Sequence, residues 1–77
     1  MAAGLHEEVV LLRDVPEQAL RSGDIGTVVH VYPKGGLEVE FFTASGKTRA
    51  VATLAERDVR TATDDDVVAV RSLSATG

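Results

Sequence analysis

The chain has 77 residues, no cysteine and a formal net charge of −4. This length allows one domain, and the lack of cysteine excludes disulfides. His6 and His30 lie far apart in the sequence and have no thiolate to assist them, so we expect neither a metal site nor a cofactor. An acidic chain repels phosphate backbones, which disfavours nucleic acid as a partner.

The expected location is the cytoplasm. The N-terminus lacks the basic and apolar regions of a signal peptide, and the longest apolar run, residues 9–12, is too short to cross a bilayer. A chain without cysteine also fits a reducing compartment. Because so small a domain has little core, its stability must come from good packing or from association, for example as a homodimer.

The first half of the chain predicts two strands. Residues 8–13 are β-branched and apolar, which favours a buried strand. Pro16 suits the start of a turn, and residues 17–20 favour one short turn of helix. Gly23 and Gly26 indicate a sharp bend or a bulge. Residues 27–32 then predict a second strand, rich in β-branched and aromatic side chains.

The second half predicts three more strands. We expect residues 33–36 to form a hairpin loop. Residues 37–42 alternate between apolar and acidic side chains, as in an antiparallel sheet with one solvent-exposed face. A turn at 44–47 leads to a strand at 48–54. A 3₁₀ turn at 55–57 precedes a last strand at 58–61. Five short strands with turns between them predict an all-β fold.

The C-terminal part gives mixed signals. Thr63 followed by three aspartates suits the start of a helix, whereas Val67–Val70 favours a strand. We favour an extended segment that adds a strand at 66–71 to a sheet edge of this or another chain. The predicted organisation is a flexible N-terminus (1–6), a barrel (7–62) and a tail (63–77).

Polar candidates for a site each have an ordinary alternative. His30 could be a general base or a pH-sensitive contact, but a strand histidine without an oriented partner is more simply a half-exposed residue. Glu38 and Glu40 share one strand face, and paired carboxylates can perform acid–base chemistry. We favour a solvated face that discourages edge aggregation and that a basic partner protein could use. Asp64, Asp65 and Asp66 lack the spacing of a calcium loop.

Tyr32 and Phe42 suggest an interface. Alternation places Phe41 and Phe42 on opposite faces, so one phenylalanine should leave the inner face. An exposed phenylalanine beside Tyr32 would indicate a contact surface, with core packing as the alternative. We predict no catalytic residue. The predicted interface consists of His30, Tyr32, Glu38, Glu40 and Phe42.

Several motifs carry a family resemblance. Residues 22–31 resemble the G-D-x-G-x-V opening of small SH3-like barrels, residues 37–41 with Gly46 resemble their second and third strands, and residues 53–60 resemble their closing 3₁₀ turn and last strand. Over residues 7–61 the chain is similar to a family of small uncharacterised bacterial proteins, a domain-of-unknown-function family. Similarity to the translation-associated KOW modules and to the barrel of the nitrile hydratase β subunit is weaker. The resemblance implies a bacterial SH3-like β-barrel of about five antiparallel strands with one short helical or 3₁₀ turn, and it implies no reaction.

These observations favour a non-enzymatic protein-binding module. Its acidic surface would dock on another, basic protein, as an accessory, immunity-type or antitoxin-type partner. One alternative is a KOW-like nucleic-acid-binding module, which rests on the turn around Gly23 and Gly26. Against it, the chain lacks basic loops and has too few aromatic residues for a stacking platform. The other alternative is a non-catalytic subunit of a larger enzyme.

Overall fold

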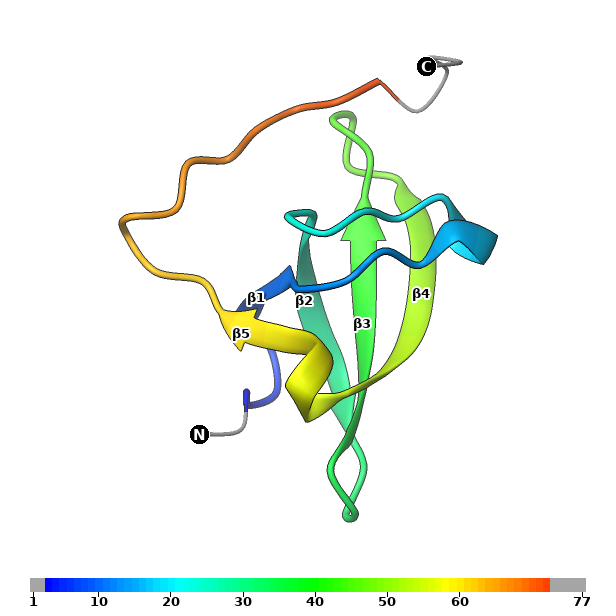
Figure 1. The fold of residues 1–77 in the computed structure, drawn as a ribbon, viewed down its shortest axis with the longest axis vertical. Helices are drawn as coiled ribbons and strands as arrows, with labels where there is room; N and C mark the ends of the chain where they lie inside the picture. The colour runs from blue at the N-terminus through cyan, green and yellow to red at the C-terminus, as the bar shows by residue number, and fades with distance from the viewer. Residues whose placement is uncertain (1–2, 73–77) are drawn as a thin grey trace.

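A computed structural model describes residues 3–72 as one antiparallel sheet with two 3₁₀ turns (Figure 1). The elements are β1 (Glu8–Leu11), η1 (Pro16–Gln18), β2 (Ile25–Val31), β3 (Gly36–Phe42), β4 (Thr48–Ala55), η2 (Glu56–Asp58) and β5 (Val59–Thr61). The strand order is β4-β3-β2-β1-β5. This confirms the predicted all-β fold of five antiparallel strands, with two 3₁₀ turns where the fold prediction had one. No helix among the described residues is long and apolar enough to cross a membrane.

Two tight hairpins join β2, β3 and β4. In the first, the Tyr32 amide donates to the Gly36 carbonyl at 2.8 Å, and Gly35 has a φ of 95°. In the second, the Thr43 amide donates to the Lys47 carbonyl at 2.8 Å, and Gly46 has a φ of 87°. Left-handed backbone of this kind favours glycine, which is why both turns form where the sequence places a glycine.

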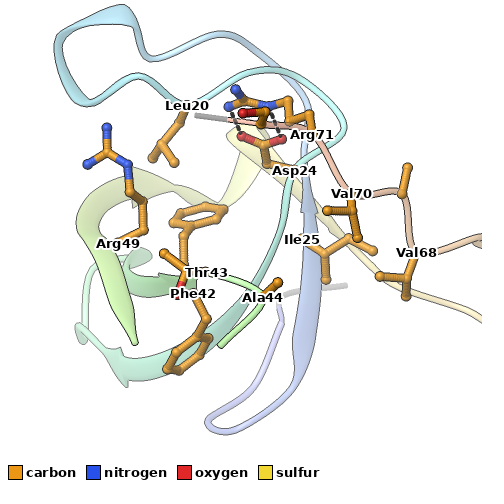
Figure 2. A pocket seen from close by; sticks show the side chains of 13 residues that line it. Leu20, Asp24, Ile25, Phe42, Thr43, Ala44, Arg49, Val68, Val70 and Arg71 are labelled. Carbon is orange, nitrogen blue, oxygen red and sulfur yellow. Dashed lines mark hydrogen bonds and ion pairs between the residues drawn. The ribbon is translucent and has the colours of Figure 1, made fainter. Parts of the chain in front are cut away.

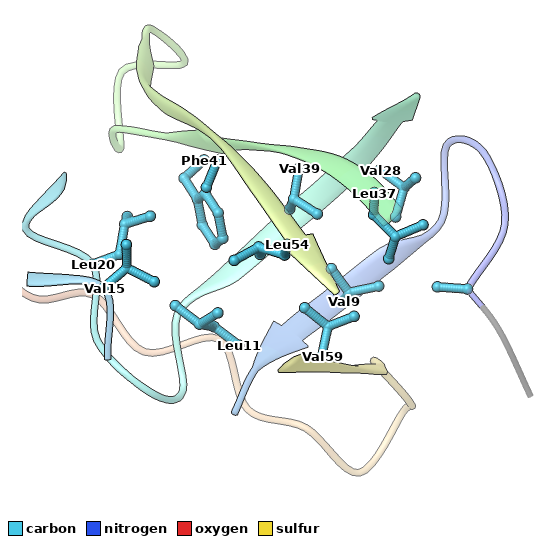
Figure 3. Close-up of a cluster of buried hydrophobic side chains, with 12 residues drawn as sticks. Val9, Leu11, Val15, Leu20, Val28, Leu37, Val39, Phe41, Leu54 and Val59 are labelled. Atoms are coloured by element: carbon cyan, nitrogen blue, oxygen red, sulfur yellow. The ribbon is translucent and has the colours of Figure 1, made fainter. Parts of the chain in front are cut away.

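The core lies on the concave side of the curled sheet (Figure 3). Every strand contributes inward side chains, and the long connection between β1 and β2 closes one end through Val15 and Leu20, which form an isolated β-bridge. The side chains of this core cluster are Ala3, Val9, Leu11, Val15, Leu20, Val28, Leu37, Val39, Phe41, Ala52, Leu54 and Val59. Alternation along the strands thus produces a single apolar interior.

Residues 3–6 pack against this body, although the predicted flexible N-terminus covered residues 1–6. Ala3 is buried in the core, and the His6 amide donates to the Val28 carbonyl at 2.7 Å. Residues 1–2 of that predicted segment, and residues 73–77 of the predicted tail, lie outside the described residues.

The described part of the tail, up to residue 72, forms no strand, so the strand predicted at 66–71 is not part of this sheet. The tail is held instead by side chains. The Arg60 guanidinium pairs with Asp66 at 2.6 Å, and the Arg71 guanidinium pairs with Asp24 at 2.6 Å. Between these two ion pairs the chain runs past the sheet (Figure 1), with Val67–Val70 exposed.

Candidate functional site

The five residues predicted as an interface all lie on the convex side of the sheet. On β3 the burial pattern alternates, with Leu37, Val39 and Phe41 buried and the residues between them facing outward. Phe41 is 3% exposed and Phe42 is 47% exposed, which confirms that one phenylalanine leaves the inner face. We call this surface the outer face; it consists of His30, Tyr32, Glu38, Glu40, Phe42 and Val51.

A β-bulge brings His30 to this face. Between β2 and β3 the pairing steps from Val28–Val39 to His30–Glu38, so Val29 is an extra residue on β2. Without it, simple alternation would turn His30 inward. The bulge therefore places the imidazole beside the Tyr32 ring, with centroids 4.6 Å apart in an edge-to-face arrangement.

Tyr32, Glu38 and Thr53 form a hydrogen-bonded group at one end of the outer face. The Tyr32 hydroxyl and the Thr53 hydroxyl each donate to Glu38 Oε2 at 2.7 Å. The tyrosine ring lies over Gly36, where a Cβ atom would come within 3.3 Å of Tyr32 Cδ2. The Tyr32 ring is thus held between Gly36 and Glu38, and the Glu38 carboxylate is held by two hydroxyl groups.

Phe42 lies at the opposite end of the same face. It is four residues from Glu38 along β3, or roughly 13 Å by strand rise. The expected contact between Phe42 and Tyr32 therefore does not form. Glu40 lies between them and accepts a hydrogen bond from the Thr48 hydroxyl. Val51, on β4, is the residue directly opposite Glu40. The candidate residues make a row, with an aromatic ring at each end and two carboxylates between.

The electrostatics of the row favour a fixed negative charge over proton transfer. Hydrogen bonds from Thr53 and then from Tyr32 lower the pKa of Glu38, with a further contribution from the charge of His30. The hydrogen bond to Glu38 raises the pKa of Tyr32. These shifts move both groups away from neutral pH, where a general acid or base would have to titrate. The arrangement suits recognition of a cation.

This coupling can be measured on a single group, because Tyr32 is the one tyrosine in the chain. Glu38→Gln removes the charged acceptor, so the pKa of Tyr32 should fall to about 10, the ordinary value. The measurement is the near-ultraviolet absorbance of tyrosinate as a function of pH. Glu40→Gln is the control, since it removes the same charge from the same face but its carboxylate binds Thr48. An equal fall in both variants would show that the hydrogen bond does not cause the shift.

Two features of the surface were not predicted from the sequence. One is the pair of threonines that hold the glutamates. The register of the turn at 44–47 would place Ala52 opposite Glu38, and the bulge at Arg49 shifts the pairing by one residue so that Thr53 lies there instead, which the sequence pattern does not indicate. The other is a cleft of about 600 Å³ between the tail and the end of the sheet (Figure 2). Its formation depends on the Arg71–Asp24 pair, for which no local signal exists.

The aspartates of the tail do not gather as cation ligands. Asp66 accepts two hydrogen bonds from Arg60 and one from the Thr63 amide, and these partners lower the pKa of Asp66. Within residues 3–72, no group of three or more histidine, aspartate or glutamate side chains is arranged to hold a metal ion.

Comparison with known proteins identifies a family. A family model described as "Domain of unknown function (DUF4926)" matches residues 5–61, which confirms the resemblance to a family of uncharacterised domains. No curated protein and no solved structure matches the chain. The matched segment contains all five strands and every residue of the outer face.

Proposed function

Because the chain belongs to DUF4926, a family of domains of unknown function, its role has to be inferred from its own surface, and we propose that it is a non-enzymatic module that docks through the outer face onto a basic protein. The observation that carries this proposal is the row of two threonine-held carboxylates between two exposed aromatic rings. A bacterial cytoplasmic module of this kind would serve as an accessory, immunity-type or antitoxin-type partner.

The apolar part of the row supplies contact area. Tyr32 is 38% exposed, Val51 is 46% exposed and Phe42 is 47% exposed, all on one side of the sheet. Protein interfaces are enriched in aromatic residues at their centres and carry polar groups around them. Rings that already stand at the surface need little rearrangement before a partner covers them.

The charged part of the row selects the partner. Glu38 and Glu40 are each held by a threonine hydroxyl, so ordering them on binding costs less than ordering free side chains. Three of the chain's arginines, Arg13, Arg60 and Arg71, are paired with aspartates and do not offset this charge. A partner that presents lysine or arginine would be steered to the face by complementary charge.

A capture experiment with matched variants tests the docking face. Tagged protein is used to recover partners from host lysate at low salt, and the recovered protein is then purified and its affinity measured by calorimetry. Glu38→Gln with Glu40→Gln should weaken binding by at least about tenfold, as expected when charge-assisted hydrogen bonds are lost. Affinity of the unchanged protein should also fall as salt rises.

The control removes two negative charges elsewhere. Asp64→Asn with Asp65→Asn lies in the tail, on the side of the molecule away from β4 (Figure 1), and should leave the affinity unchanged. If both double variants bind equally well, or if no dominant partner is recovered by the unchanged protein, the outer face is not a docking surface.

A further inference from the structure

The cleft at the end of the sheet has the size and lining of a small-molecule site. It measures about 600 Å³, within the range of ligand pockets. One wall comes from the sheet and its loops, and the other comes from the tail (Figure 2). Its apolar lining includes Leu20, Ile25, Phe41, Phe42, Val68 and Val70. We propose that this cleft binds a small amphipathic carboxylate, with its hydrocarbon chain between the two walls and its carboxylate on Arg49.

The apolar lining is uncovered in the isolated chain. Val68 is 75% exposed, Val70 is 80% exposed and Phe42 is 47% exposed. A hydrocarbon chain lying between Phe42 and the valines would remove apolar surface from water on both walls at once. Because Val67–Val70 belongs to no strand, these side chains can close on a ligand without loss of sheet pairing.

The charged lining selects an anion. It comprises Asp24, Arg71 and Arg49, which together leave one positive charge. Asp24 and Arg71 neutralise each other: Arg71 Nε donates to Asp24 Oδ1 at 3.0 Å and Nη2 donates to Oδ2 at 2.6 Å. Partial burial alone would raise the pKa of Asp24, but the hydrogen bonds and charges of Arg71 and Arg21 outweigh it and lower that pKa.

Arg49 is the cation that remains. Its guanidinium makes no hydrogen bond or ion pair with the other residues that the structure describes. Figure 2 shows it across the cleft from Val68 and Val70. The pairing of β3 with β4 steps from Phe41–Ala50 to Phe42–Thr48, so Arg49 is the extra residue of a bulge, and bulges redirect side chains. A guanidinium presents two parallel donors that match a carboxylate.

The proposal is tested on the full chain with octanoate, by following amide signals in two-dimensional NMR. Octanoate should shift the amides of Ile25, Phe42 and Val70 in a saturable manner and leave Lys34, in the distant hairpin, unmoved. Octylammonium has the same hydrocarbon chain and the opposite charge, and it should bind at least tenfold more weakly. No saturable shift with octanoate, or equal binding of octylammonium, would overturn the proposal.

Paired arginine variants test the anchor. Arg49→Gln should weaken octanoate binding at least tenfold, whereas Arg57→Gln, an equal loss of charge in η2, should leave it unchanged. Equal affinities in the two variants would show that Arg49 is not the anchor, and amide dispersion verifies that each variant is folded. The Glu38→Gln, Glu40→Gln protein should bind octanoate like the unchanged chain, so this proposal and the docking proposal can fail separately.

Discussion

Leu11→Ala should lower the free energy of unfolding by about 2–5 kcal/mol, the range for a buried leucine that leaves a cavity. Leu11 is fully buried at the end of β1, among the side chains of the core (Figure 3). A chain of this length has a total stability of roughly 4–12 kcal/mol, so the substitution removes a large fraction of it. The measurement is a urea titration followed by circular dichroism.

The next residue is the matched control. Leu12 has the same side chain but is 47% exposed, and its backbone amide, which donates to the Asp58 carbonyl at 2.8 Å, is retained in the variant. Leu12→Ala should therefore change the free energy of unfolding by about 0.5 kcal/mol or less. Comparable losses in the two variants would mean that β1 does not face the core as described.

Gly26→Ala should also be destabilising, by about 1–3 kcal/mol, because there is no room for the added methyl group. A Cβ atom at Gly26 would lie 2.6 Å from Val39 Cγ1, 2.9 Å from the Glu40 carbonyl oxygen and 3.0 Å from Phe41 Cδ1. Two of these atoms belong to buried core side chains and one to the β3 backbone. None of them can move away without disturbing the core or the strand. Chemical denaturation gives the loss directly.

Gly4→Ala is the control for the glycine substitution. A Cβ atom there would meet its nearest neighbour, Glu7 Oε1, at 3.5 Å, an ordinary contact. Its stability should stay within about 0.5 kcal/mol of the unchanged protein or increase, since alanine restricts the unfolded chain more than glycine. If Gly26→Ala were equally well tolerated, β2 and β3 would not lie as close together at Gly26 as described.

Local patterns were sufficient to predict the five strands of the sheet. Alternation in residues 37–42 predicts β3 and assigns Glu38 and Glu40 to its wet face, because side chains in a strand point alternately to either side. Gly35 and Gly46 predict both hairpins, since the backbone they need is open mainly to glycine. The same alternation places the side chains of Phe41 and Phe42 on opposite faces of the sheet. Each of these conclusions depends on residues within a few positions of one another.

The arrangement of the surface depends on contacts that no local pattern encodes. Bulges at Val29 and Arg49 decide that His30 joins the outer face and that Arg49 turns to the cleft, and a bulge arises from the fit of one strand against its neighbour. The tail is placed by Arg71, which pairs with Asp24 across 47 positions of sequence. The β-branched residues between positions 67 and 70 also predict a strand for residues 66–71. A strand needs an edge to pair with, however, and only the folded chain determines whether one lies beside it.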